Sequence, residues 1–166
     1  MGSYNWGKTD VTAWILEHFQ EGATCLDVGA CDGIWHSWIG PHLIMDAVEA
    51  FGPNINYYNL PKKYRKVYEA DIADFEYDWY DLIIFGDVIE HMDVEKAQRV
   101  LAYAWERCTD MIVAVPYLYP QDAIYGNPYE VHVQPDLTPE IFDERYPGFE
   151  LIKGSDFYGY YHKAKK

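Results

Sequence analysis

The sequence predicts an α/β fold with a mostly parallel sheet, and three observations lead to it. Short apolar runs of strand length alternate with segments of helical periodicity. The first apolar run, 25–28, breaks directly into a glycine-containing turn, as a buried parallel strand does where it leads into a ligand loop. The last two strand-like segments, 149–153 and 157–162, are joined by Gly154-Ser155-Asp156 and read as an antiparallel hairpin.

The first half of the chain contains one clear helix and two short helical segments. Residues 9–20 carry apolar side chains at helical spacing, with Thr9 or Asp10 as the expected cap and Gly22 as the expected end. A short helix is expected at 34–40, and 51–66 is similarly abbreviated. One layer of the fold is therefore thin, which leaves room for a partner subunit such as a second copy of the chain.

The second half contains two well-marked helices and one long irregular segment. Asp93 is expected to cap a helix with one apolar side, and Thr138-Pro139 begins another. Residues 116–135 are rich in Tyr, Pro and Asn and show no periodicity. A loop of this length in a small domain is usually functional. The expected parallel strands of the whole chain are 25–28, 45–48, 67–71, 81–87 and 111–115.

The stretch 24–33, TCLDVGACDG, is the main indication of function. Gly29 and Gly33 bracket a loop in which the missing Cβ atoms let the backbone approach a ligand. The next apolar run ends in an acid, Glu49. Glu49 lies sixteen residues after Gly33. In nucleotide-binding βαβ units an acid at about this separation from the glycine loop accepts hydrogen bonds from ribose hydroxyls. The loop and the acid together indicate a cofactor that contains adenosine.

Four segments in this order resemble the class I S-adenosylmethionine-dependent methyltransferases. The loop Asp27-Val28-Gly29-Ala30-Cys31-Asp32-Gly33 follows the family's D-x-G-x-G-x-G pattern, with Cys31 in place of the middle glycine. Glu49 matches the family's ribose acid, and Asp71-Ile72 matches its adenine-binding pair. The run from Tyr80 to His91 is similar to the family's fourth strand with its Glu-His ending. The resemblance implies one Rossmann-like domain over residues 1–166, with a seven-stranded sheet, an antiparallel C-terminal hairpin and helices on both faces.

The resemblance also implies how the cofactor, S-adenosylmethionine, is bound. The methionine end is expected against the loop backbone, the ribose at Glu49 and the adenine between Asp71 and Ile72. Asp27 is expected to hold the loop or to meet the amino group of the cofactor. The expected cofactor-binding residues are Asp27, Gly29, Ala30, Cys31, Gly33, Glu49, Ala50, Asp71, Ile72, Gly86 and Asp87.

Two histidines are candidates for the catalytic base. Transfer to a hydroxyl requires removal of its proton, and histidine titrates near neutral pH. His91 closes the Glu-His pair, and His132 lies in the long irregular segment. The resemblance implies that His91 lines the cleft and that His132, a few residues before the Thr138-Pro139 helix start, faces the acceptor. It therefore favours His132, although each histidine could instead have a structural role. Acceptor-binding residues are expected at Tyr117, Tyr129 and Glu130, and at Tyr4 and Trp6 in an aromatic arm before the first helix.

Composition excludes several other classes of function. The formal net charge of −14, from 13 basic and 27 acidic residues, disfavours binding to nucleic acid. The three cysteines have no metal-ligand spacing, so no metal is expected from them, and their odd number argues against a disulfide framework. No apolar run approaches the length of a membrane span and the first residues lack a signal-peptide core, so the sequence predicts a cytoplasmic protein.

These observations predict a methyltransferase that acts on a hydroxyl of a small molecule, such as a sugar or a biosynthetic metabolite. An amine or a carboxylate is the second choice of acceptor. Two alternatives stay open at this point. One is a non-catalytic cofactor-binding module or partner subunit. The other is an enzyme that uses the same cofactor for chemistry other than methyl transfer.

Overall fold

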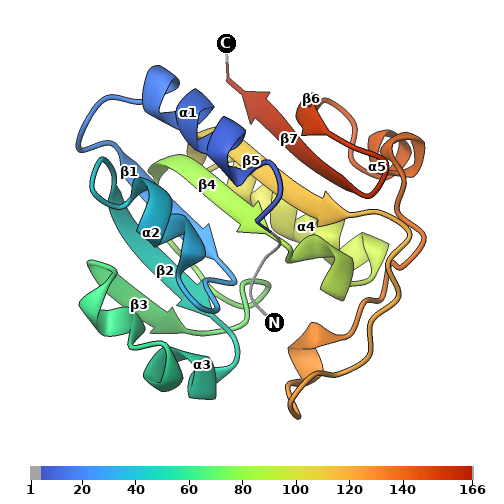
Figure 1. Cartoon of the computed structure of the whole chain (residues 1–166), viewed down its shortest axis with the longest axis horizontal. Helices are drawn as coiled ribbons and strands as arrows, with labels where there is room; N and C mark the ends of the chain where they lie inside the picture. Colours follow the sequence, from blue (N-terminus) through green and yellow to red (C-terminus); the bar gives the residue numbers. More distant parts are fainter. Residues whose placement is uncertain (1–4, 166) are drawn as a thin grey trace.

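The computed structural model describes residues 5–165 and contains one seven-stranded sheet. The strand order is β3-β2-β1-β4-β5-β7-β6 (Figure 1). Neighbouring strands from β3 to β5 are parallel, and β7 is antiparallel to both β5 and β6. This confirms the predicted fold class. The strands are β1 Thr24–Val28, β2 Ile44–Glu49, β3 Lys66–Glu69, β4 Tyr80–Gly86, β5 Cys108–Pro116, β6 Glu150–Gly154 and β7 Tyr158–Ala164.

Helices cover both faces of the sheet, with α1 and α2 in front of it and α4 behind it in Figure 1. Alternate residues of β4 face the two layers. Leu82 and Ile84 join a core with α1 and α2, whereas Ile83 and Phe85 join a core with α4 and α5. The helices are α1 Lys8–His18, α2 Ile34–Ile39, α3 Gly52–Tyr57, α4 Val94–Trp105 and α5 Pro139–Arg145, with 3-10 turns η1 Leu60–Lys62, η2 Ile89–His91 and η3 Pro128–Glu130.

Two helix starts follow the predicted capping chemistry and one does not. The Asp93 carboxylate accepts the Lys96 backbone N–H at 2.8 Å, and the Thr138 hydroxyl accepts the Ile141 N–H at 3.2 Å. The prediction for α1 was wrong, because the cap is Gly7 in a left-handed conformation and the helix ends at His18. A side chain at Gly7 would meet the Tyr160 ring at 2.8 Å, so packing against β7 determines this start.

The strand bounds differ from the predicted ones by one to three residues, and the differences at β3 and β5 have a clear cause. β3 lies at the edge of the sheet, pairs only with β2 and ends at Glu69, so Asp71 lies beyond it. β5 runs from Cys108 to Pro116 because β4 and β7 supply hydrogen-bonding partners along its length. Pairing between strands therefore decides where these elements end.

The order of the strands reverses between β1 and β4. The chain moves outward from β1 through β2 to β3 and then returns to β4 on the other side of β1. In open α/β sheets, ligands bind beyond the carboxyl ends of the strands at such a point. Among residues 5–165, no helix has the length and apolar character needed to cross a membrane.

Candidate functional site

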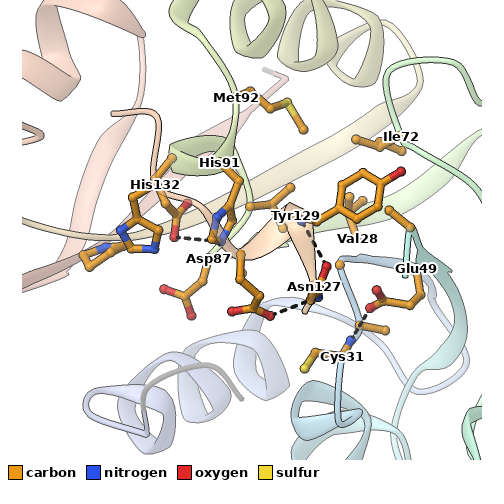
Figure 2. A pocket seen from close by; sticks show the side chains of 18 of the residues that line it. Val28, Cys31, Glu49, Ile72, Asp87, His91, Met92, Asn127, Tyr129 and His132 are labelled. Carbon is orange, nitrogen blue, oxygen red and sulfur yellow. Dashed lines mark hydrogen bonds and ion pairs between the residues drawn. The ribbon is translucent and has the colours of Figure 1, made fainter. Parts of the chain in front are cut away.

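A cavity of about 470 Å³ opens at the carboxyl ends of β1, β2 and β4. Its walls come from the loop after β1, the ends of β2 and β4, the segment after β3 and the long segment after β5. Figure 2 shows Cys31 and Glu49 on one side of it and Asp87, His91 and His132 on the other. One cavity thus contains both the predicted cofactor residues and the predicted catalytic residues. The predicted residues that line it are Gly29, Ala30, Cys31, Glu49, Ala50, Asp71, Ile72, Gly86, Asp87, His91, Tyr117, Tyr129, Glu130 and His132.

The loop after β1 turns at three residues with left-handed backbone conformation. Gly29, Cys31 and Gly33 have φ angles of 69°, 44° and 73°. A Cβ on Gly29 would lie 2.7 Å from a Val88 methyl group, so glycine is required there for packing as well as for conformation. The loop backbone forms one wall of the cavity.

The Glu49 carboxylate is held by the same loop. One oxygen accepts the Cys31 backbone N–H at 2.8 Å, and the other accepts the Phe51 N–H at 2.9 Å. The side chain of Asn54 donates to it as well, at 3.4 Å. Burial raises the pKa of Glu49, and these hydrogen bonds oppose that effect. The carboxylate is therefore fixed in position with lone pairs left for a ligand.

Asp71 lies on the wall of the cavity just after β3. Its carboxylate accepts a hydrogen bond from the Lys96 ammonium at 2.9 Å and from the Ala73 backbone N–H at 3.0 Å. Burial opposes ionisation, but these partners prevail and lower the pKa of Asp71. Asp71 is thus an ionised acceptor at neutral pH, next to the apolar side chain of Ile72.

Asp27 and Gly33, both predicted to bind the cofactor, do not line the cavity. The Asp27 carboxylate is buried and accepts the Tyr64 hydroxyl at 2.5 Å. Burial raises its pKa to about 7, against the effect of the Tyr64 hydrogen bond and the Lys8 charge. Gly33 faces the side chains of Lys63 and Tyr64. Both residues connect the loop to the segment before β3, which fits the loop-holding role expected of Asp27.

The aromatic arm contributes only indirectly. Trp6 does not line the cavity, but Phe157 and Tyr158 do. The Trp6 ring packs edge-on against both of these rings, with centroid distances of 5.4 Å to Phe157 and 6.4 Å to Tyr158. The position of Trp6 is fixed because its carbonyl accepts the Tyr160 hydroxyl. Tyr4, the other predicted residue of the arm, lies outside the described residues.

His91 and His132 are neighbours in the fold although they lie 41 positions apart in the sequence. Their rings meet edge to face with centroids 4.7 Å apart. Nδ1 of His91 donates to the Val131 carbonyl at 3.1 Å, and Nδ1 of His132 donates to the Tyr119 carbonyl at 2.6 Å. Because a carbonyl can only accept, Nε2 of each neutral ring keeps its lone pair. Burial is the main cause that lowers the pKa of both histidines, so both are neutral at pH 7.

The segment after β5 is attached to η2 by the backbone of Glu90. The carbonyl of Glu90 accepts the N–H groups of Val133 at 2.8 Å and Gln134 at 3.0 Å. The Gln134 amide also donates to the carbonyls of Ile89 and Met92. These bonds hold the segment over the end of β4, and in Figure 1 its orange ribbon extends past the strand ends. They explain how His132 reaches His91.

The predicted acceptor residues have unequal freedom. The hydroxyl of Tyr117 is buried and paired with the hydroxyl of Tyr161, which leaves its ring as the part that faces the cavity. Tyr129 is 45% exposed and lines the cavity. In Figure 2 its ring lies between His91 on one side and Glu49 on the other. The Glu130 carboxylate meets the amide groups of Asn127 and Gln121.

Several other residues at or next to the site could not be recognised from the sequence. Tyr158 comes from β7 and donates its hydroxyl to the Asp87 carboxylate at 2.6 Å. Lys8 does not line the cavity itself; it is fully buried, and its ammonium lies 5.0 Å from the centre of the ring of Trp35, which does line it. Burial lowers the pKa of Lys8, and the charges of Asp87 and Asp27 oppose this. Further lining residues outside the predicted set include Trp35, Asn54, Glu90, Met92, Lys96, Tyr119, Gln121, Asn127 and Phe157.

No protein-family model matches the sequence, and no curated protein matches it. Solved structures with a similar fold do exist. An S-adenosylmethionine-dependent methyltransferase from Clostridium acetobutylicum ATCC 824 has a TM-score of 0.72 at 10% identity, covering 100% of this chain and 93% of that chain. The 1,6-didemethyltoxoflavin-N1-methyltransferase of Burkholderia thailandensis has a TM-score of 0.70 at 13% identity, covering 97% of this chain and 79% of that chain.

A third similar structure is magnesium protoporphyrin IX methyltransferase from Synechocystis PCC 6803 with bound SAM. Its TM-score is 0.69 at 13% identity, and the match covers 100% of this chain and 86% of that chain. Identities this low establish the fold and nothing about the substrate. The chain therefore has the Rossmann-like fold seen in S-adenosylmethionine-dependent methyltransferases.

Proposed function

We propose that the chain binds S-adenosylmethionine and transfers its methyl group to a hydroxyl of a small molecule. One observation carries the proposal. The loop backbone at Gly29–Cys31, the fixed Glu49 carboxylate and the Asp71-Ile72 pair surround one cavity at the point where strand order reverses. The same fold in solved methyltransferases, one of them with bound SAM, supports this assignment.

The polar groups match the parts of the cofactor. Glu49 would accept hydrogen bonds from the ribose hydroxyls with the lone pairs that Cys31 and Phe51 leave free. Asp71 would accept from the adenine amino group, with Ile72 against the ring. The loop backbone would hold the methionine end, and the methyl group would then point toward the two histidines.

The reaction would be an in-line displacement. The acceptor oxygen forms a bond to the methyl carbon, the carbon–sulfur bond breaks, and its electron pair stays on sulfur to give S-adenosylhomocysteine. The hydroxyl proton passes to Nε2 of His132 or His91, both neutral near pH 7. Orientation of the reactants alone can supply roughly 7–11 kcal/mol of the barrier reduction.

The mouth of the cavity favours an acceptor with a flat or apolar face. Tyr119, Tyr129 and Phe157 are 50%, 45% and 44% exposed and all line it. Exposed aromatic rings at a cavity mouth can stack on a sugar or a planar ring.

We include a cytoplasmic location in the proposal, because all three cysteines are free thiols. The short helices α2 and α3 leave room for a second copy of the chain, which light scattering on the purified protein would detect.

Calorimetric titration with S-adenosylmethionine and S-adenosylhomocysteine tests the proposal. We expect micromolar binding of both, weakened at least tenfold by Glu49→Gln, which keeps the shape of the side chain. Glu150→Gln, at an exposed position on β6, is the matched control and should bind like wild type. Absence of binding to a folded sample would overturn the proposal. Binding without release of S-adenosylhomocysteine from any acceptor would leave a cofactor-binding module.

A further inference from the structure

Three side chains with metal-ligating atoms meet at the end of β4. These are Glu90 and His91 of η2 and His132 of the segment after β5, and one ligand atom from each lies within 4.8 Å of the others. Ligands at about 2.1 Å from a single ion lie roughly 3–4 Å apart, so small side-chain rotations bring the three atoms to bonding distance. All three residues line the cavity.

Glu90 provides the independent indication of a ligand. Its side chain is fully buried, and neither carboxylate oxygen has a hydrogen-bond partner among residues 5–165. Nε2 of the neutral His91 ring lies 4.0 Å from one Glu90 carboxylate oxygen, which is too far for a hydrogen bond. A buried carboxylate without partners costs free energy, and proteins usually keep such a group only where an ion or a ligand pairs with it.

The two histidines are already oriented as metal ligands. In most metal sites each ligating imidazole donates its other N–H to a carbonyl or carboxylate, which fixes the ring. His91 and His132 each donate from Nδ1 to a backbone carbonyl and turn Nε2 away from it. In Figure 2 both rings lie on the same side of the pocket, close to Asp87.

We propose that Glu90, His91 and His132 bind one divalent transition-metal ion, such as Zn²⁺ or Mn²⁺. Two imidazoles and one carboxylate favour a first-row transition metal over Mg²⁺ or Ca²⁺, which prefer ligands that are all oxygen. Three protein ligands leave at least one coordination position open. Since the three residues line the cavity, this position faces the proposed acceptor.

The use of the ion rests on the proposed function. An acceptor hydroxyl bound at the open position would lose its proton to bulk water near neutral pH, because the ion lowers the pKa of the oxygen it binds. The oxygen then forms its bond to the methyl carbon as the carbon–sulfur bond breaks. With the ion bound, Nε2 of His132 and of His91 is occupied by the metal, so the ion replaces the histidine base of the proposed function and neither ring takes the proton. An acceptor with two adjacent oxygens would chelate the ion, so catechol-like rings and vicinal diols are the expected class.

Metal binding can be measured without any acceptor. Wild-type protein treated with chelator is titrated with ZnSO₄, MnCl₂ or MgCl₂ alone, and with CoCl₂ while the visible spectrum is recorded. We expect one Zn²⁺ per chain, Co²⁺ absorption bands typical of nitrogen and oxygen ligands, and much weaker binding of Mg²⁺. Glu90→Gln, His91→Ala and His132→Ala should each weaken Zn²⁺ binding by more than the 10–100-fold that loss of an outer-shell contact costs.

His18→Ala is the matched control, since His18 is exposed on α1 and far along the chain from the cluster. It should bind Zn²⁺ like wild type. The proposal fails if wild type binds no Zn²⁺ or Co²⁺, or if His18→Ala loses binding as the cluster variants do. The Co²⁺ spectrum of wild type keeps the test valid if a variant does not fold. S-adenosylhomocysteine binding without metal binding would sink this inference alone, whereas metal binding without cofactor binding would sink the proposed function alone.

Discussion

Cys31 adopts a left-handed backbone conformation at the position where the similar methyltransferase motif has its middle glycine. Its N–H donates to Glu49, and its sulfur lies 3.9 Å from the Asn54 amide nitrogen. A small unbranched side chain is therefore tolerated where the turn needs a positive φ. The loop geometry, more than the glycine itself, is what the proposed cofactor site requires.

We expect Cys31→Gly to bind S-adenosylhomocysteine as wild type does, because glycine adopts this conformation freely. Cys31→Val should lose about 2 kcal/mol of stability, since a β-branched residue is strained at positive φ. Urea unfolding and calorimetry of the two variants test this. Equal stability of the valine variant and wild type would show that the turn is less constrained than the φ of 44° implies.

Asp27 should make the stability of the protein depend on pH. Its pKa is about 7 in the folded state, above its ordinary value of 3.8, because the carboxyl group is buried. The folded state then holds the proton more tightly, so this contribution is fully present below about pH 4 and is lost as the pH rises toward 7. The difference is on the order of 4 kcal/mol.

Asp27→Asn isolates this effect, because the amide oxygen can still accept the Tyr64 hydroxyl. Wild type should lose stability relative to the variant between about pH 4 and pH 7, as measured by urea unfolding across that range. Parallel curves for the two proteins would mean that Asp27 titrates normally in the fold.

At the scale of elements, Gln134 joins the long segment after β5 to the rest of the fold. Its buried amide makes hydrogen bonds on both sides. The amide nitrogen donates to Ile89 and Met92, and the oxygen accepts from Arg145 at 3.1 Å and from Tyr146 at 2.9 Å. One side chain thus links η2 to α5 through the segment that carries His132.

Gln134→Ala should cost about 3 kcal/mol, because it leaves several buried polar groups without partners. We expect faster hydrogen exchange over residues 117–137 and weaker Zn²⁺ binding, with the exchange of β1 and β4 unchanged. Gln98→Ala is a suitable control, since Gln98 is exposed and makes one hydrogen bond, to the Arg145 carbonyl. Uniform acceleration across the sheet would indicate a global effect instead.

Elements and caps marked by local chemistry could be predicted from the sequence. The apolar runs of β1, β2 and β4, the Asp93 and Thr138 caps and the C-terminal hairpin all follow from periodicity and capping rules. The meeting of His91 with His132 could not be predicted, because it depends on backbone hydrogen bonds between distant segments. The sequence also could not predict that the Glu90 carboxylate is buried without hydrogen-bond partners, because this depends on which distant segments pack around it.

At the scale of the whole molecule, the net charge of −14 should keep nucleic acids away. Even the local basic cluster at 62–66 is partly engaged, because Arg65 pairs with Asp46 and Lys63 donates to the Asp32 carbonyl. Binding of polyanions requires free clustered cations. We expect no change in the fluorescence anisotropy of labelled RNA or duplex DNA at low salt. Salt-dependent binding would point to an acceptor that is a nucleic acid and would contradict the small-molecule proposal.

The position of β7 has a consequence for biosynthesis. A ribosome releases β6 before β7, yet β7 lies between β5 and β6 in the sheet. While β7 is still in the exit tunnel, β5 has an open edge and Asp87 lacks the Tyr158 hydroxyl. The nascent chain therefore has an unpaired apolar strand that can aggregate or recruit a chaperone. The cavity is completed only when this last strand of the sheet has been translated and inserted.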